Sequence, residues 1–137
     1  METQELVDDL RRRGVETTRV ELKAAAGGLP KSTVETLSAF ANARGGTLLL
    51  DIDNDLRPVD ADVEALRDAL SRMASTDLVP PLRGEIDIEV IDGKHRIVRF
   101  DVPEVPLEDK PCYVSTRGRY HGSFIRSGEG DHRLTRR

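Results

Sequence analysis

Four acidic residues and one lysine fall in two short segments in the first half of the chain. Glu16 stands five residues before Glu21, Lys23 follows two residues later, and an apolar run farther on leads into Asp51 and Asp53. Carboxylate oxygens are the ligands that Mg²⁺ and Mn²⁺ prefer in proteins. A divalent cation held by them can activate water and neutralise the charge that develops on a phosphodiester. These residue types therefore suit metal-assisted phosphoryl chemistry, provided that the two segments meet.

Strand geometry allows most of these side chains to meet. Residues two apart in a strand share a face, so Glu21 and Lys23 are expected to point the same way. Asp51 and Asp53 likewise share one face of the later strand, whose other face is expected to hold Leu48, Leu50 and Ile52. If the two strands are neighbours, the four polar side chains converge at one edge of a sheet.

Glu16 is harder to place in this cluster. Five residues of extended chain span about 17 Å and put Glu16 and Glu21 on opposite faces. Glu16 therefore joins the others only if the chain bends at Thr17 and Thr18. The alternative interpretation is that each acid caps a turn, pairs with a nearby arginine or is solvated, and forms no site.

The hydrophobic pattern predicts the elements that would position these residues. Helices are expected over Glu2 to Arg13 before Gly14, from Pro30 to Gly45–Gly46, and along the period Val59, Val63, Leu66, Leu70 and Met73, with Asp60 or Asp62 at its N-terminus. Strands are expected over 20–23 and 47–53, in a hairpin over 85–102 that turns at Asp92–Gly93, and in a second hairpin of 112–115 with 120–126 that turns at Arg117–Gly118. This order predicts a single α+β domain over 1–137. Its mixed β-sheet has β-hairpins in the C-terminal half, with roughly three helices packed mainly on one face.

Composition excludes several classes of protein. No apolar run approaches the roughly 18 residues of a membrane span, and the N-terminal segment has no signal-peptide core, so we expect a cytoplasmic protein with no membrane partner. A single cysteine forms no internal disulfide, and with three scattered histidines it predicts no zinc site. Gly27–Gly28 lacks the strand–GxGxxG–helix context, so no bound nucleotide is expected.

Four segments of the chain form a characteristic set. They read V-E-L-K, L-S-A-F-A-N-A-R-G-G-T-L-L-L-x-I-D, K-P-C-Y and S-F-I-R-S-G, within a span from Glu16 to Gly128. Together they resemble the Schlafen core domain, also called the AlbA-like or divergent AAA-associated domain, and A-F-A-N-x-x-G-G is the most specific block. Bacterial members are described as nucleic-acid-binding modules, often fused to an ATPase-like or winged-helix part. Two alternatives stay open for residues 1–137: a chain that ends naturally at Arg137, or the N-terminal part of a longer protein.

The resemblance also implies a site. Eukaryotic members include endonucleases that act on tRNA and rRNA through two glutamates and an aspartate, and by motif these positions are Glu16, Glu21 and Asp53. Here they would hold Mg²⁺ or Mn²⁺, with Lys23 stabilising the developing charge. The chain departs from the family pattern at Leu22, which replaces an aromatic residue, and at Asp51 and Asp60, which replace glycines. The zinc ligands of some eukaryotic members have no counterpart.

Positive charge gathers near the end of the chain although the net charge is −4. Residues 117–137 contain six arginines against two acids, while residues 51–62 contain five aspartates and one arginine. Guanidinium groups suit phosphate geometry, so we expect RNA or DNA phosphates to contact Lys110, Arg117, Arg119 and Arg126. Tyr113 and Phe124 are expected in the core. For Tyr120, core packing and base stacking both stay open.

Three functions fit these observations. The preferred one is a nucleic-acid-binding module of the Schlafen AlbA-like type. The first alternative is a divalent-metal-dependent endoribonuclease that acts on structured RNA such as tRNA. The second is an interaction or dimerisation module, for instance a homodimer, that binds no nucleic acid. The net charge of −4 favours this last alternative, because nucleic-acid binding depends on cations that displace counterions.

Overall fold

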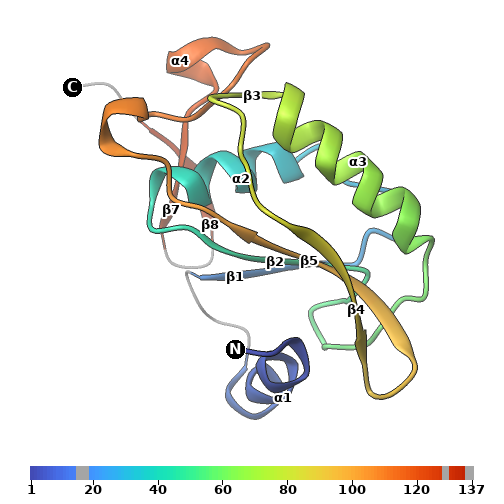
Figure 1. Ribbon diagram of the computed structural model, residues 1–137. Helices are drawn as coiled ribbons and strands as arrows, with labels where there is room; N and C mark the ends of the chain where they lie inside the picture. The colour runs from blue at the N-terminus through green and yellow to red at the C-terminus, as the bar shows by residue number, and fades with distance from the viewer. Residues whose placement is uncertain (15–18, 128–129, 135–137) are drawn as a thin grey trace.

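The fold is built on a four-stranded mixed sheet (Figure 1). The computed structural model describes residues 1–14, 19–127 and 130–134. The strands lie in the order β1 (Val20–Lys23), β2 (Gly46–Leu50), β5 (His95–Val102) and β4 (Ile86–Ile91). β1 and β2 are parallel, and the other two neighbouring pairs are antiparallel. A parallel pair needs a crossover connection, which contains α2 (Thr33–Asn42). The predicted α+β class with a mixed sheet is confirmed.

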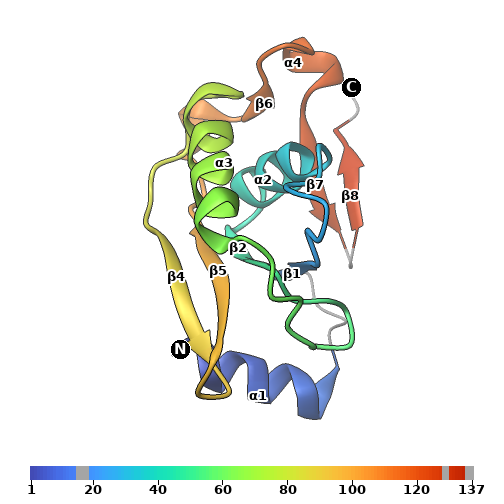
Figure 2. The same cartoon turned by 90° about the vertical axis from the view of Figure 1, so that its right-hand side faces the viewer.

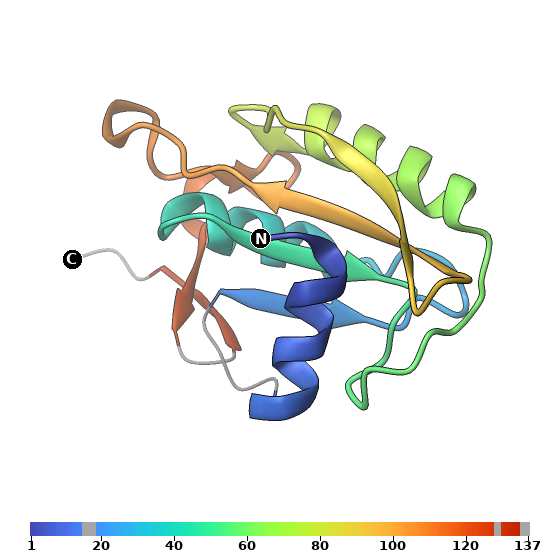
Figure 3. The same ribbon diagram turned by 60° about the horizontal axis from the view of Figure 1, so that its bottom comes forward.

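Helices cover both faces of the sheet. α2 and α3 (Val63–Thr76) lie on one face, and α1 (Thr3–Arg13) lies on the other (Figures 2 and 3). Alternation along β2 supplies both cores: Leu48 and Leu50 pack in the larger cluster with α2 and α3, whereas Leu49 packs in the cluster with α1. Two of the three longer helices therefore share a face, as predicted, and α1 covers the reverse side.

The helix boundaries follow from the capping residues. α3 begins at Val63 because the Asp62 carboxylate accepts a hydrogen bond of 3.1 Å from Ala65 N. Asp62 is thus the N-cap, and Val59 lies before the helix. α2 begins at Thr33, three residues after Pro30, and α1 ends before Gly14, whose φ is 87°.

The expected alternation fails after β2. Asp51 has φ of 71°, in the left-handed region, so the chain bends there and the side-chain alternation shifts by one position. Ile52 consequently packs with Leu49 in the α1 cluster, not with Leu48 and Leu50. The prediction that Leu48, Leu50 and Ile52 share one face was wrong for Ile52.

Of the two hairpins predicted in the C-terminal half, one forms and the other does not. β4 and β5 pair as predicted, and both Asp92 and Gly93 in their turn have positive φ. The second hairpin was wrong: β6 (Tyr113–Val114) pairs with β3 (Leu78–Val79), and β7 (Phe124–Ser127) pairs with β8 (Gly130–Arg133). Between β6 and β7 the short helix α4 (Gly118–His121) replaces the expected turn, and η1 (Leu107–Asp109) precedes β6. A single bridge between Tyr113 and Ser123 remains of the expected pairing.

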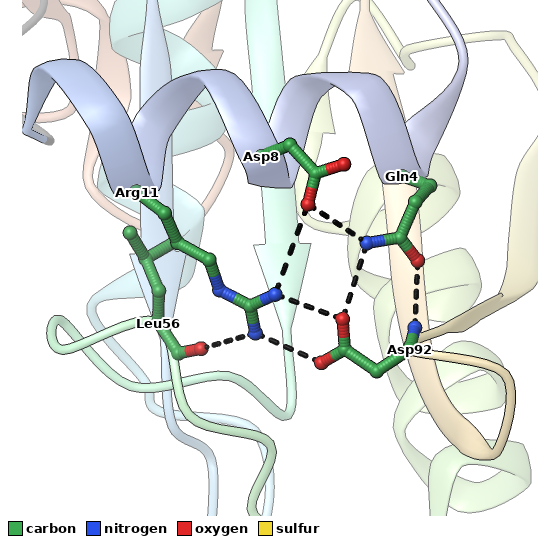
Figure 4. Close-up of polar contacts among 5 residues, drawn as sticks. All are labelled: Gln4, Asp8, Arg11, Leu56 and Asp92. Atoms are coloured by element: carbon green, nitrogen blue, oxygen red, sulfur yellow. Dashed lines mark hydrogen bonds and ion pairs between the residues drawn. The ribbon is translucent and has the colours of Figure 1, made fainter.

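A polar network fixes α1 to the β4–β5 turn (Figure 4). The Arg11 guanidinium donates to both carboxylate oxygens of Asp92, at 2.8 and 2.9 Å, and to the Leu56 carbonyl at 2.9 Å. Gln4 donates to Asp92 Oδ1 at 3.1 Å and accepts from Asp92 N at 2.6 Å. These bonds lower the pKa of the Asp92 carboxyl from 3.8 to about 2, with the Arg11 hydrogen bond as the main cause.

This lowered pKa predicts an acid-dependent loss of stability. A carboxylate with a depressed pKa in the folded state stabilises above its unfolded value, here 3.8, and the contribution is lost as pH falls through about 2. Because the pair is about one-third exposed, we expect Asp92→Asn to cost about 1 kcal/mol at pH 7. Urea unfolding from pH 7 to pH 2.5 should show this difference shrinking below pH 4. Asp55→Asn is the control, since Asp55 has no ion-pair partner within the described ranges. A difference that stays constant with pH would contradict the assignment.

Candidate functional site

The predicted pair Glu21 and Lys23 lies in a partly buried cluster of opposite charges. Lys23 Nζ is 3.6 Å from Glu21 Oε2, and Arg126 donates to Glu21 Oε1 at 2.7 Å. Arg126 also donates to Asp131 Oδ1 at 3.0 Å and to the Val20 carbonyl at 3.3 Å. Only 3% of the Arg126 side chain is exposed. Two cations and two carboxylates thus neutralise one another at the edge of β1.

The other predicted acids have different surroundings. Asp53 Oδ1 accepts from the backbone N–H groups of Asp55 and Arg57, at 2.9 and 3.0 Å, and so stabilises the turn after β2. Asp51 is fully buried, and its carboxylate accepts from Ala61 N at 2.9 and 3.1 Å. Burial raises the pKa of the Asp51 carboxyl. Asp51 was expected to converge with Glu21, Lys23 and Asp53 at one edge of the sheet. That expectation was wrong for Asp51, because the left-handed bend turns its carboxylate inward.

The three-acid metal site stays a prediction because Glu16 lies outside the described residues. Within the described ranges, no group of three or more His, Cys, Asp or Glu side chains is placed to hold a metal ion. Glu21 already accepts from Arg126, and Asp53 accepts from two backbone donors. These two acids alone do not provide the donor set for a divalent cation.

The A-F-A-N-A-R-G-G block joins the end of α2 to the sheet. Phe40 is fully buried, and the guanidinium of Arg126 lies over its ring, 5.1 Å from the centroid. A Cβ at Gly46 would overlap the Phe40 ring, and one at Gly45, whose φ is +76°, would lie 2.5 Å from the Val102 carbonyl oxygen. Both positions therefore require glycine. Within the block, the Phe40 ring packs against the Arg126 guanidinium, and Gly45 allows the end of α2 to lie close to β5.

Asn42, from the same block, holds two distant segments together. Its side-chain amide donates to the carbonyls of Cys112 and Phe124, both at 2.9 Å, and its Oδ1 accepts from Cys112 N at 2.6 Å. Cys112 is fully buried, and burial raises the pKa of its thiol to about 12. Cys112 thus packs as a small apolar residue, and Asn42 fixes the backbone on both sides of α4.

A cationic hollow opens beside this junction. It has a volume of about 630 Å³ and is lined by Arg19, Ala43, Arg44, Gly45, Glu104, Lys110 and Arg126. It lies where β2 begins and β5 ends. Lys110 Nζ pairs with Glu104 at 2.7 Å and donates to the Ala43 carbonyl at 3.3 Å, which fixes its ammonium group in the hollow. Arg19 and Arg44 are exposed. Among the described residues that line the hollow, four are cationic and one, Glu104, is acidic, a composition suited to a polyanion.

A comparison with protein-family models shows to which family the chain belongs. The family model described as Schlafen, AlbA_2 matches residues 16–135. The chain belongs to this family. The family assignment agrees with the resemblance inferred from the four sequence segments, and A-F-A-N-x-x-G-G is the segment that organises the observed junction. A comparison with curated proteins found no match.

Solved structures share the Schlafen AlbA_2 fold seen here. One is the solution NMR structure of the N-terminal domain of a Nitrosomonas europaea protein named as related to the ATP-dependent DNA helicase RecG. It is 32% identical, with a TM-score of 0.72 over 100% of this chain and 95% of that one. The crystal structure of the DIP2311 protein from Corynebacterium diphtheriae is 15% identical, with a TM-score of 0.61 over 93% of this chain and 25% of that one. The second likeness concerns the fold alone.

The basic residues predicted from the sequence are divided among three places in this Schlafen AlbA_2 domain. Lys110 lines the cationic hollow, and Arg126 lines it while directing its guanidinium to carboxylates. Arg119 lies over the Tyr113 ring beside a second hollow that shares Lys110. Arg117 pairs with Glu35 at 2.8 Å and lines a separate depression.

The sequence prediction missed two cations of the hollow, Arg19 and Arg44. Arg44 stands inside the most specific family block, directly before Gly45, and that position was a usable signal. Arg19 has no such motif, and only the parallel pairing of β1 with β2 shows that it lies near the start of β2.

No helix in the described part of the chain has the length and apolar character needed to cross a membrane.

Proposed function

We propose that this domain binds nucleic acid through phosphate groups at the cationic hollow. The supporting observation is the composition of the hollow: among the described residues that line it, Arg19, Arg44 and Lys110 are cationic and Glu104 is the one acid. The helicase-related name of the Nitrosomonas europaea protein agrees with this proposal. Arg126 contributes less, because Glu21 and Asp131 already neutralise its charge.

Local charge explains how an acidic chain can bind a polyanion. The net charge is −4, but five aspartates fall in residues 51–62, and this segment follows β2 at the end opposite the hollow. Charges farther apart than about 10 Å are screened from each other at 0.1 M salt. The cations of the hollow therefore act on a phosphate largely independently of the acidic segment.

Arg44→Ala should weaken binding of labelled single-stranded RNA and DNA about fivefold at low salt. Each phosphate contact on a single strand contributes about −0.7 to the slope of log K against log salt. The slope measured for the variant should therefore be less negative than that of wild type by about 0.7. Fluorescence anisotropy across a salt series measures both quantities. Arg57→Ala is the matched control, since Arg57 is exposed in the loop that follows β2, at its other end.

A variant of opposite sign sharpens this test. Glu104→Gln removes the carboxylate that pairs with Lys110 at 2.7 Å, and it should strengthen binding by making the ammonium group available to phosphate. Equal effects of Arg44→Ala and Arg57→Ala would contradict the location. Undetectable binding of wild type at low salt would contradict the proposed function and favour the interaction or dimerisation module. Analytical sedimentation would then measure the oligomeric state of the protein.

The second candidate function is a metal-dependent endoribonuclease. One observation favours it: Lys23 lies 3.6 Å from Glu21 on the same face of β1, so a cation stands beside one of the three predicted acids. Glu16, Glu21 and Asp53 would hold Mg²⁺ or Mn²⁺, and the ion would supply an activated water. The same RNA, or tRNA, incubated with either metal provides the test on a denaturing gel. Cleavage that EDTA stops supports this candidate, and intact RNA under every metal contradicts it.

A further inference from the structure

A second, more apolar hollow adjoins the cationic one. It has a volume of about 410 Å³ and is lined by Asn42, Leu107, Lys110, Pro111, Arg119, Tyr120, Ser123 and Leu134; we call it the tyrosine hollow. The two hollows share Lys110. Leu107 is 83% exposed and Tyr120 is 58% exposed, so two large apolar side chains face solvent at one place. A surface that combines an exposed aromatic ring, an aliphatic side chain and flanking cations is typical of sites that take a flat ligand joined to an anion.

Tyr120 is presented on a fixed backbone. Val114 N donates to the Gly122 carbonyl at 2.8 Å, and Gly122 N donates to Gly118 O at 2.8 Å. Ser123 Oγ donates to the Arg119 carbonyl at 2.5 Å. Together with the Asn42 bonds to the neighbouring segments, these contacts close α4 into a small rigid loop. A ring carried on a fixed backbone segment loses less conformational freedom on stacking than a ring on a segment that must first be ordered.

The cations beside the ring are held as well. The Arg119 guanidinium lies 5.9 Å from the centroid of the Tyr113 ring, and Lys110 is fixed by Glu104 and the Ala43 carbonyl. Positive charge therefore borders the tyrosine hollow at Arg119 and connects it with the cationic hollow at Lys110. This charge argues for an anionic ligand and against an apolar peptide or a neutral small molecule.

We propose that the tyrosine hollow takes an unpaired base of a single-stranded nucleic acid, stacked on Tyr120, while the adjoining phosphates lie at Lys110, Arg119 and the cationic hollow. This inference rests on the proposed function and adds a strand preference to it. In a duplex the bases are paired and stacked on one another, so they cannot enter the hollow. Every base has a π-face, so stacking here selects unpaired strands without selecting a sequence.

Tyr120→Ala and Tyr120→Phe, with matched oligonucleotides, test the proposal. The probes are an oligothymidine, a strand of equal length with abasic sites in place of bases, and a duplex of equal length. Wild type should bind the oligothymidine about tenfold more tightly than the abasic strand, and Tyr120→Ala should remove that difference. Tyr120→Phe should retain it, because the ring remains. Duplex affinity should be the same in all three proteins.

A spectroscopic readout monitors the ring itself. The chain has two tyrosines and no tryptophan, so a Tyr113→Phe background leaves Tyr120 as its only tyrosine emitter. Oligothymidine should quench this emission, whereas the abasic strand should not.

The outcomes separate this inference from the proposed function. If Arg44→Ala weakens binding of all probes but Tyr120→Ala weakens none, phosphate binding stands and base stacking is overturned. Equal affinity of wild type for the oligothymidine and the abasic strand also overturns the stacking. If wild type binds no probe at low salt, the proposed function fails and the inference fails with it.

Discussion

Asn42→Ala is expected to lower the free energy of unfolding by about 3 kcal/mol, since a buried polar group left without a partner costs about 1–3 kcal/mol. Asn42 is 6% exposed and forms three hydrogen bonds to the Cys112 and Phe124 backbone. The Cys112 carbonyl keeps a second donor, Ser38 Oγ at 2.8 Å. Cys112 N and Phe124 O, however, lose the side-chain partner that the structure gives them.

Urea unfolding measures this loss, and hydrogen exchange locates it. Protection should fall most for residues 110–124, because Asn42 fixes the backbone on both sides of α4. Asn54→Ala is the matched control: Asn54 is exposed in the turn after β2, and surface substitutions usually change stability by less than about 0.5 kcal/mol. A loss below 1 kcal/mol for Asn42→Ala, or one spread evenly over the chain, would contradict the bridging role.

The sequence was informative wherever local periodicity and turn chemistry determine the structure. The helical period through Leu66 and Leu70 predicts α3, and Asp92–Gly93 predicts the β4–β5 turn, because both signals depend on residues close in the chain. The prediction failed at Asp51, where one left-handed residue changes the face on which Ile52 packs. It failed again between β6 and β7, where pairing with β3 and β8 replaces the local hairpin. Such choices depend on partners that are distant in sequence.

In the candidate site, too, local features were predictable from the sequence and features that depend on distant segments were not. Glu21 and Lys23 were predicted to share a face, and they do, because two residues on one strand need no knowledge of the tertiary fold. The cationic hollow combines Arg19, Arg44 and Lys110 from three separate segments, and no spacing rule relates them. Arg126 was expected on the second hairpin, in contact with nucleic-acid phosphates. Its burial depends on Phe40, Glu21 and Asp131, which come from three other elements.

Arg126→Met is expected to lower the free energy of unfolding by about 3 kcal/mol, because removing one partner of a buried ion pair leaves an uncompensated charge. The cluster of Glu21, Lys23, Arg126 and Asp131 holds two positive and two negative groups, so the single variant leaves a net charge of −1. Methionine replaces the aliphatic stem of the arginine but not its guanidinium, and the loss therefore reports mainly the charged group. Urea unfolding of wild type and variant measures it.

Arg117→Met is the matched control for this prediction. The Arg117–Glu35 distance is 2.8 Å, close to the 2.7 Å of Arg126–Glu21, but Arg117 is 38% exposed and Arg126 is 3% exposed. An exposed pair contributes about 0–1 kcal/mol and is screened by salt. The Arg126→Met loss should therefore exceed the Arg117→Met loss and should persist in 1 M NaCl. Equal losses, or a loss at Arg126 that salt removes, would show that burial does not determine the strength of the pair.

A second substitution tests the charge balance directly. Combining Arg126→Met with Asp131→Asn restores a net charge of zero and leaves Glu21 paired with Lys23 at 3.6 Å. Thr36 Oγ1, now 2.7 Å from Asp131 Oδ2, can still donate to the asparagine oxygen. The double variant should therefore recover part of the stability lost in Arg126→Met, although it carries one more substitution. If it is less stable than the single variant, unpaired charge is not the cause of the loss, and the hydrogen bonds of Arg126 to Glu21 and the Val20 carbonyl must account for it.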